Sequence, residues 1–484
     1  SSAKPDSAFH VVDGNLFVGN VSGIDTVVFF RDLPLVFCYK NMYRQNVSGG
    51  ALETYGYKTV MMSEKVYENR TIPDGPGAVV GGSFFLFVVV DCEMVRNYYP
   101  FFLQNAMFTA GVLRIDGLLR PRLGKLVSKW NRYGENDPMG VATVQVKTGD
   151  FVDSNSLYYG AGVTESGGAI LGIFGNIDID GIYVVGNYAF KTASGVVVEK
   201  GTALKMKNSK ILDNGHKLEQ TYEEYFESLS NKSHFAPQSQ EELMEMIPEE
   251  MRTLAQEYLE KRSELTKDVH SDFYEPFYSL SPPDISDIKV SREVPPNSSS
   301  GFRATGGASM TIDNCVFSGN LATFTSIMEF EECFDVKGTI SNSTFEGNES
   351  TSGLSTKVSE CDLTMTNVTF RNNKAHTLTA GISISEGTLL MQDSLMEYQG
   401  SDQVTAFLFA SLDSEVTVIN TKFQYALGSN AIFSLASRNI NIRNSEFINC
   451  RGGAIGGSYT QNLSLQEVTF QGNEITRSIG GDIN

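Results

Sequence analysis

The chain has few of the residues from which metal centres, disulfide frameworks and membrane spans are built. Its 484 residues include six cysteines, five histidines and one tryptophan. No C-x-x-C pair occurs and the histidines are scattered, so neither a disulfide scaffold nor a metal site is predicted. The best apolar run, residues 84–90, is shorter than the roughly 18–20 residues of a membrane helix, and we interpret it as a buried strand. We expect no cofactor, no metal and no membrane span in this chain.

Basic residues are also fewer than acidic residues. With 38 Lys and Arg against 57 Asp and Glu, the formal net charge is −19. A surface of that sign repels phosphate groups, so we expect neither nucleic acid nor an anionic membrane as a partner. The first residues, SSAKPDSAF, have no signal-peptide pattern, as in a mature fragment or a cytosolic protein. Apolar residues make up 41% of the chain, which supplies a large core and excludes wholesale disorder.

What the chain does contain is an internal repeat. In the C-terminal third, four columns recur every 23 to 28 residues: an apolar residue, a polar residue, a small residue and a final Phe or Met. We call the final residues anchors: Phe317, Phe345, Phe370, Met396, Phe423, Phe447 and Phe470. A looser copy predicts further anchors in the N-terminal half at Phe17, Tyr43, Tyr67, Val95, Phe151, Val184 and Ile211.

This repeat predicts an all-β fold, a parallel β-helix solenoid. A period near 25 residues, with short alternating segments separated by Gly, Asn and Ser, is typical of stacked β-coils. The Phe column is expected to stack in the core. The Asn column, three residues before each anchor, is expected to occupy bends and to hydrogen-bond the next coil. We expect coils over residues 1–214 and 301–484.

Two segments break the repeat and differ in charge. Residues 215–300 contain an acidic helical stretch and a Pro/Ser-rich linker, and Leu243, Ile247 and Leu254 fall on one stripe of the helix. The segment near 113–140 is basic, with Arg114, Arg120, Arg122, Lys125 and Trp130, and we expect a second insertion there. The two surfaces predict a head-to-tail contact between copies. The alternative is a contact within one chain, in which the helix lies on its own rod.

Two short motifs of the repeat resemble those of the Pmp-type repeat proteins, which occur on bacterial and protist surfaces. One motif stands as FVGN (17–20), FSGN (317–320) and FEGN (345–348), and the other as GGAL (49–52) and GGAI (167–170 and 452–455). The resemblance implies a right-handed parallel β-helix of the pectin-lyase-like kind. It also implies an extracellular or cell-surface rod with a structural or adhesive role.

These observations favour a non-enzymatic, secreted structural or adhesive glycoprotein. It would be a segment or subunit of a larger surface or filamentous assembly, with other copies of itself or other chains as partners. The alternative is a carbohydrate-active enzyme, a polysaccharide lyase or glycosidase, or a carbohydrate-binding β-helix. Asp178 and Asp180 lie on one strand face, but the polygalacturonase-like signature is missing, and we interpret the pair as a solvated face.

Nine N-x-S/T triplets favour N-linked glycans as part of the mature protein. The candidate acceptors are Asn69, Asn231, Asn297, Asn342, Asn367 and Asn462. Asn20, Asn46 and Asn348 end the F-x-x-N motif or its Tyr variant, and we expect them to face the neighbouring coil without glycan.

Two cysteines share one place in the repeat. Cys333 and Cys361 each lie 16 residues after an anchor, which puts them in one column with Cα atoms about 4.8 Å apart. That distance fits a disulfide, which an oxidising compartment would form. A stack of two buried thiols is the alternative.

Overall fold

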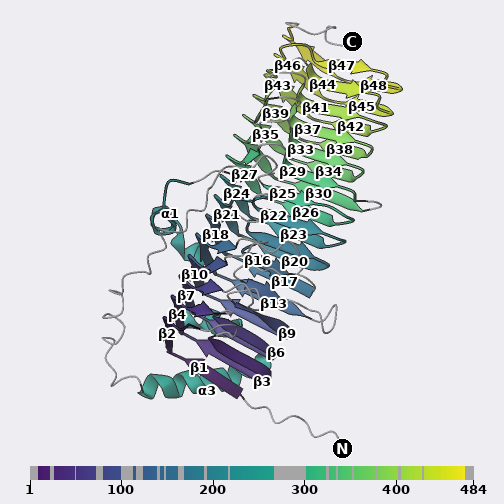
Figure 1. The fold of residues 1–484 in the computed structure, drawn as a ribbon. Coiled ribbons are helices and arrows are strands. Elements are labelled where there is room, and N and C mark those ends of the chain that lie inside the picture. The colour runs from purple at the N-terminus through teal and green to yellow at the C-terminus, as the bar shows by residue number, and fades with distance from the viewer. Residues whose placement is uncertain are drawn as a thin grey trace, which may run out of the picture.

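The chain winds into a long rod of parallel β-coils, with its two ends at opposite ends of the rod (Figure 1). The computed structural model describes residues 9–21, 27–48, 51–71, 80–99, 113–115, 124–138, 142–146, 149–161, 168–189, 193–215, 218–265, 301–322, 326–333, 336–350, 354–376, 379–401, 405–427 and 430–474. The predicted solenoid is therefore confirmed.

The strands form four sheets that run along the rod. The 15-stranded sheet takes one short strand from each coil: β2 (Leu16–Val18), β4 (Met42–Arg44), β7 (Lys65–Tyr67), β10 (Glu93–Val95), β14 (Arg132–Gly134), β18 (Leu157–Tyr159), β21 (Tyr183–Val185), β24 (Lys210–Leu212), β27 (Val316–Ser318), β31 (Thr344–Glu346), β35 (Thr369–Arg371), β39 (Leu395–Glu397), β43 (Lys422–Gln424), β46 (Glu446–Ile448) and β49 (Thr469–Gln471).

The 26-stranded sheet is the largest. It contains β1 (Phe9–Asp13), β3 (Val28–Tyr39), β6 (Leu52–Met62), β9 (Val80–Val90), β12 (Leu113–Ile115), β13 (Lys125–Lys129), β16 (Val144–Val146), β17 (Gly149–Ser154), β19 (Ile170–Ile173), β20 (Gly175–Asp180), β22 (Val196–Glu199), β23 (Ala203–Lys207), β25 (Phe302–Ala304), β26 (Ser309–Asp313), β29 (Ser326–Glu331), β30 (Lys337–Ser341), β33 (Leu354–Ser359), β34 (Asp362–Thr366), β37 (Thr379–Ser385), β38 (Thr388–Gln392), β41 (Thr405–Ser411), β42 (Glu415–Ile419), β44 (Asn430–Leu435), β45 (Asn439–Arg443), β47 (Ile455–Ser458) and β48 (Asn462–Gln466).

Two small sheets and four helical elements complete the described structure. The small sheets are β5 (Val47–Ser48), β8 (Arg70–Thr71), β11 (Tyr98–Tyr99) and β15 (Asp137–Pro138), and β28 (Leu321–Ala322), β32 (Glu349–Ser350), β36 (Lys374–Ala375) and β40 (Gly400–Ser401). The helical elements are α1 (Tyr222–Ser228), the 3-10 helix η1 (Lys232–Phe235), α2 (Gln240–Glu245) and α3 (Glu249–Leu265).

The chain turns at residues with positive φ, and in the C-terminal coils the bends on either side of the anchor strand are mostly Asn or Gly. Asn314 has φ 50° between β26 and β27, and Gly319 has φ 64° after β27. Asn342 and Asn367 repeat the first bend with φ 49° and 53°. Asn tolerates this left-handed conformation better than most residues, which explains the Asn column. Gly168, in a GGAI motif, leaves no room for a side chain, because a Cβ would lie 2.1 Å from the carbonyl oxygen of Ser194.

The anchors form a continuous column in the core. Phe317 pairs with Phe345 and Phe345 with Phe370, with ring centroids 4.7 Å apart in both pairs. The helical insertion does not shift this register, because Ile211 pairs directly with Phe317 across it. All the C-terminal anchors predicted from the repeat occupy this column.

Three N-terminal anchors were assigned to the wrong residue. The column contains Val66, Met94 and Tyr158 in place of Tyr67, Val95 and Phe151. Tyr67 and Val95 face outward, where the insertion packs on them. An apolar residue is therefore favoured on both faces of β7 and β10, and an assignment shifted by one residue fits their pattern equally well. Phe151 instead lies in β17 of the 26-stranded sheet, where it pairs with Leu126 and Ile177.

A second column inside the rod is an asparagine ladder. Asn348 Nδ2 donates to the carbonyl of Phe317 (3.0 Å) and to Oδ1 of Asn373 (2.9 Å). Its own Oδ1 accepts from the backbone N–H and Nδ2 of Asn320, at 3.0 and 2.9 Å. The same bonds link Asn20, Asn46, Asn69, Asn97 and Asn136, and again Asn187, Asn214, Asn320, Asn348 and Asn373. Each amide thus satisfies buried backbone groups of its neighbours.

The core also contains a buried carboxyl group that the repeat did not predict. Glu64 stands in line with Asn15 and Asn41, and its Oε1 accepts from the backbone N–H and Nδ2 of Asn41 (3.2 and 2.9 Å). Burial raises the pKa of the Glu64 carboxyl to about 8, although the bonds from Asn41 lower it. The group is therefore mainly protonated at neutral pH.

We predict that Asn348→Ala lowers the free energy of unfolding by about 3 kcal/mol, because it leaves several buried donors and acceptors unpaired. Chemical denaturation followed by far-UV circular dichroism measures the change. Asn462→Ala, at an exposed asparagine on β48, is the control and should change stability by less than about 0.5 kcal/mol. Equal effects of the two substitutions would contradict the role of the ladder.

We predict that Glu64 makes the protein less stable as the pH rises. Its folded pKa lies above the ordinary value, so its contribution is complete below about pH 4.5 and is lost as the pH approaches about 8. Glu64→Gln cannot ionise, so it should gain on the wild type by about 1.4 kcal/mol per pH unit within this window. Melting temperatures of both proteins from pH 4 to 9 measure this, and parallel curves would refute it.

Candidate interaction surface and modification sites

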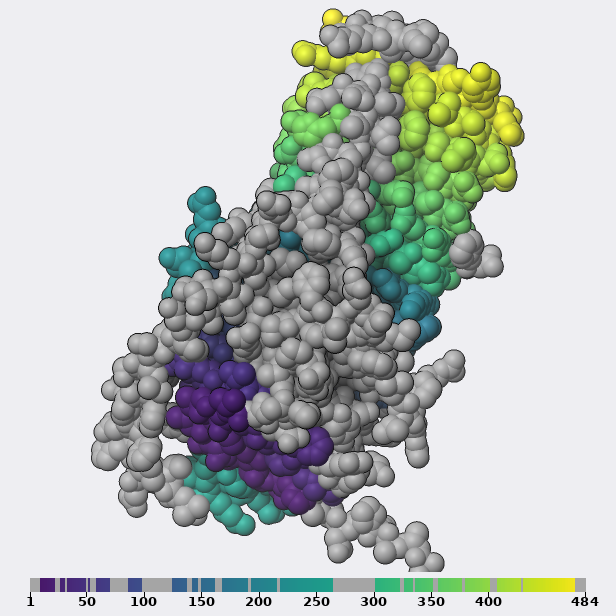
Figure 2. All heavy atoms as spheres, in the orientation of Figure 1, coloured from purple at the N-terminus to yellow at the C-terminus, as the bar shows by residue number. Residues whose placement is uncertain are grey.

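The helical insertion lies on the outside of its own rod, against the N-terminal coils. α1 and η1 cover the outer face of the 15-stranded sheet, where Tyr222 and Phe235 pack with Val95 and Tyr159. Figure 2 shows the other part of the insertion, in teal, against the purple coils at the N-terminal end. The N-terminal coils therefore have an apolar outer surface, and the insertion buries it. A rod whose outer face was in contact with water would have a polar surface there.

The apolar residues proposed for a contact between copies are buried within the chain. Trp130 is 4% exposed and Ile247 1%, and both belong to one core cluster with Met251 and residues of β3, β6 and β9. Leu243 packs at the edge of the same cluster, whereas Leu254 is half-buried outside it. The head-to-tail contact through these anchors is therefore wrong. The alternative within one chain is the arrangement found.

The basic segment is only in part an insertion. Lys125 begins β13, a regular rung that pairs with β9 before it and β17 after it. Lys125 is exposed, and Arg114 lies in β12 with its side chain outside the described part. Arg120 and Arg122 lie outside the described residues. The positive charge of this segment therefore did not indicate which of its residues form a strand of the solenoid and which form an insertion.

Ion pairs hold the insertion at both of its contacts with the rod. Arg96 bonds Glu223 at the start of α1 and Glu135 on the next coil (3.1 Å). The bond from Arg96 lowers the pKa of the Glu223 carboxyl. At the far end of α3, Tyr258 donates to Asp13 Oδ2 (2.7 Å), and Arg262 bonds the same carboxylate. The sequence predicted two segments of opposite charge. It did not predict these ion pairs, because their residues lie far apart in the chain.

Beneath α1 lies a group of titratable side chains that the sequence analysis missed. Tyr67 and Tyr222 both donate to the Glu93 carboxylate, at 2.6 and 3.0 Å. Burial raises the pKa of both tyrosine hydroxyls. Arg132 lies 3.3 Å from Asp91 and donates to the carbonyl of Phe235 (3.1 Å). Because these groups bond one another, the cluster fastens the insertion to the rod.

The exposed carboxylates of the rod face cations of the next rung. Asp178 pairs in register with Lys205, and Asp180 with Lys207, and both carboxylates are exposed. Asp180 also accepts from Asn208 Nδ2 (2.7 Å). Within the described residues, no group of three or more His, Cys, Asp or Glu side chains is arranged to hold a metal ion. Each carboxylate of the pair thus has a lysine in register on the next coil.

The sequons fall into two classes by burial. Asn46, Asn69 and Asn348 are at most 2% exposed, and both N–H groups of each amide are bonded within the ladder. A glycan does not fit there, so the assignment of Asn69 as an acceptor is wrong. Asn20 also bonds along the ladder but is exposed, because it stands at the end of the ladder within the described residues.

The remaining candidate acceptors lie at the surface, except one. The exposed asparagines are Asn231, at the start of η1, Asn342 and Asn367, at successive bends, and Asn462, on β48. Asn342 and Asn367 use their amides in a ladder on the outside, where Asn367 Nδ2 donates to Asn342 Oδ1 (2.9 Å). Asn297 lies outside the described residues.

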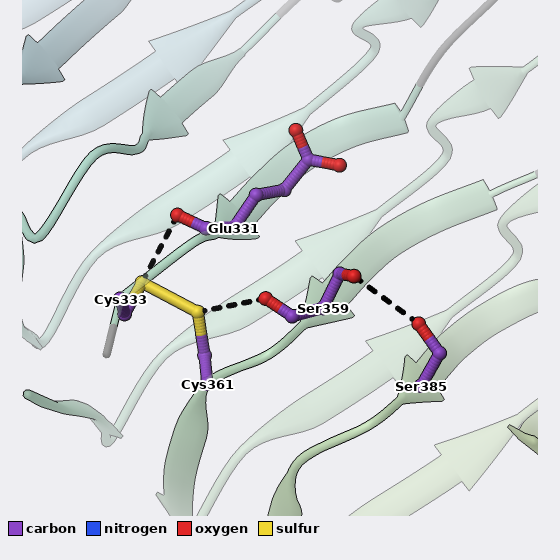
Figure 3. Close-up of a disulfide and its surroundings, with 5 residues drawn as sticks. All are labelled: Glu331, Cys333, Ser359, Cys361 and Ser385. Atoms are coloured by element: carbon purple, nitrogen blue, oxygen red, sulfur yellow. Dashed lines mark hydrogen bonds between the residues drawn. A yellow bond between two sulfur atoms is a disulfide. The ribbon is translucent and has the colours of Figure 1, made fainter. Parts of the chain in front are cut away.

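The structure joins Cys333 and Cys361 in a disulfide between adjacent coils (Figure 3). Their Cα atoms are 5.0 Å apart and their separation in sequence is 28 residues. Both cysteines are buried, and so are Cys38, Cys92, Cys315 and Cys450. The bond therefore links two rungs through the bend that follows β29 and β33.

We predict that Ile247→Asp detaches the insertion without unfolding the rod, because the new carboxylate would be buried beside Trp130 without a partner. Trp130 is the only tryptophan, so its fluorescence should move to longer wavelength and become quenchable by iodide. Far-UV circular dichroism should keep its strand signal. Gln256→Asp, at an exposed position of α3, is the control. Unchanged emission in Ile247→Asp would show that the insertion does not need this contact.

Comparison with known proteins supports the fold. A family model described as a right-handed β-helix region matches residues 283–402. No curated protein and no solved structure matches the chain. No helix in the described ranges is both long and apolar enough to span a membrane. The strand order and register above show a parallel β-helix, and the family match over residues 283–402 supports this fold.

Proposed function

We propose that the chain is a non-enzymatic structural or adhesive rod of the Pmp-like type, a secreted glycoprotein that belongs to a larger surface or filamentous assembly. The observation that carries this proposal is the use of the repeated polar residues. The amides of the inner ladder bond one another and the backbone. The outer carboxylates Asp178 and Asp180 lie in register with Lys205 and Lys207, and Asp180 accepts a hydrogen bond from Asn208 on the next coil. A side chain whose hydrogen bonds serve the next rung builds the rod and is not poised for chemistry.

Two features support a secretory route. The disulfide between Cys333 and Cys361 is of a kind that forms and persists in oxidising compartments. The exposed sequons at Asn231, Asn342 and Asn367 are accessible to carry glycan, whereas the buried ones serve the ladder. Carbohydrate-active β-helices instead gather acidic side chains at a fixed separation around the bond that they break.

We predict glycan on Asn231 in the native protein and none on Asn46, Asn69 or Asn348. Intact-mass analysis before and after glycosidase treatment, followed by non-reducing peptide mapping, tests this and should recover Cys333 and Cys361 in one linked peptide. Native protein with unmodified sequons and two free thiols would place the chain outside the secretory route. Turnover of a polysaccharide that is abolished by Asp178→Asn or Asp180→Asn, but not by Asp150→Asn on the same face, would support the enzyme instead.

A further inference from the structure

The outer surface of the rod becomes apolar on two neighbouring coils of the C-terminal half, those of β41 and β44 (Figure 1). Leu412, at the bend after β41, is 56% exposed, and Leu435, at the end of β44, is 41% exposed. Phe409 and Phe433 are half-buried on the same two strands, and their parallel rings have centroids 6.2 Å apart. We call these four side chains the leucine patch.

The patch departs from the residues that occupy the same columns on the preceding coils. In register with its two phenylalanines, those coils contain Ser383 and Lys357. At the bend, where the patch has Leu412, they contain Glu386 and Glu360. The coils stack equally well with polar or charged side chains in these columns, so the fold itself does not require apolar residues there.

Leu412 is also unfavourable in an isolated rod. Its φ is 48°, a left-handed conformation that leucine adopts less readily than Asn or Gly. Contiguous exposed apolar side chains on a soluble protein mark a contact with another molecule. The apolar outer surfaces around Trp130 and Tyr159 on the N-terminal coils are covered by the helical insertion. The described helices are therefore engaged there, and the leucine patch needs another occupant.

Two opposite charges border the patch on its two coils. Asp413 is the second residue of the bend after β41, and its backbone N–H donates to the carbonyl of Ala436 on the next coil (3.0 Å). Arg438 lies on that next coil, and its backbone N–H donates to the carbonyl of Ser414 (3.0 Å). Both charged side chains are exposed, and the Arg438 guanidinium lies 3.4 Å from Glu415. A carboxylate and a cation thus lie at nearly the same place along the bend, one coil apart.

We propose that the leucine patch is a contact between two copies of the chain, whose rods lie side by side in antiparallel directions. The two-fold axis runs along the strands, between the coils of β41 and β44. It brings Asp413 of each copy next to Arg438 of the other and sets Phe409 opposite Phe433. The same surface is used by both copies, so the contact is complementary in charge and closes as a dimer.

Charges on the preceding coils favour the antiparallel arrangement over a parallel one. Glu332, Glu360 and Glu386 occupy one column at successive bends before the patch. Parallel rods would hold the two columns of glutamates against each other, and like charges in such a contact repel. In antiparallel rods the glutamate column faces the coils that follow β44, where Tyr459 stands in the same column.

This inference rests on the proposed structural role and names one partner of the assembly, a second copy of the chain. It adds a lateral contact, through which rods associate in pairs along their C-terminal coils. The contact uses the flank of the rod, so it leaves the inner columns and the helical insertion as they are.

Charge reversal distinguishes a contact between copies from a contact within one chain. Asp413→Lys brings two cations together at the joint and Arg438→Glu brings two carboxylates together. Each variant alone should therefore dimerise roughly tenfold more weakly than the wild type, measured by analytical ultracentrifugation of the full chain. An equimolar mixture of the two variants should recover dimers, because in a mixed dimer each new lysine meets a new glutamate and each remaining Arg438 meets Asp413. A contact within one chain cannot produce this recovery.

A substitution within the patch provides a second test. Leu435→Lys buries a charge in the apolar contact and should weaken dimerisation by roughly tenfold or more. Leu427→Lys is the matched control, because Leu427 is 48% exposed but follows β43 and lies outside the patch. It should change the dissociation constant by less than about twofold. Far-UV circular dichroism of each variant checks that the coils remain folded.

Three results would overturn the contact: a wild type that is monomeric at every protein concentration, a mixture of the charge variants that associates no better than its components, or equal effects of the two leucine substitutions. A protein that is glycosylated and disulfide-bonded yet monomeric would overturn the contact alone and leave the proposed function standing.

Discussion

The structure depends on one geometric constraint, the spacing of about 4.8 Å between stacked strands. At this spacing each side chain inside the rod lies directly on its counterpart in the next coil. Flat rings and planar amides fit such a stack, which explains why Phe recurs in the anchor column of the C-terminal coils and Asn in the ladder. The parallel rings of Phe317 and Phe345, with centroids 4.7 Å apart, follow from the same spacing as the bonds from Asn320 to Asn348. The bends must also recur at fixed positions, so residues that tolerate positive φ recur with them.

The sequence predicted the features that repeat and missed those that occur once. The anchors from Phe317 to Phe470 could be predicted because many coils contain a similar residue at the same place. The cysteine pair could be predicted because two successive coils contain Cys at the same distance from an anchor. Tyr67 and Val95 were misassigned because the insertion makes the outer face of their strands apolar as well. The stripe that contains Ile247 indicated a buried helix face, but a stripe does not identify the surface that buries it. No sequence pattern predicted that Glu64 is buried, because its burial depends on the complete coils around it.

Functional information in a solenoid of this kind lies in its departures from the repeat. The inner asparagines bond one another, and the exposed Asp178 and Asp180 lie in register with lysines of the next coil. What remains are the insertion and the sequons at the surface. The insertion fastens to the rod through Arg96 and Asp13, so it behaves as part of the same body. Glycans at the bends of successive coils would leave the inner columns undisturbed.

The contact between Tyr258 and Asp13 has a consequence for the order of folding. These residues are 245 positions apart, whereas the ladder joins coils about 25 residues apart. A ribosome adds roughly 5–20 residues per second, so the first coils wait for roughly 12–50 s before the helix that covers them exists. During this time the side chains of Phe37 and Val60 face solvent. The N-terminal half is therefore the part of the nascent chain that most needs protection by chaperones, although its coils are made first.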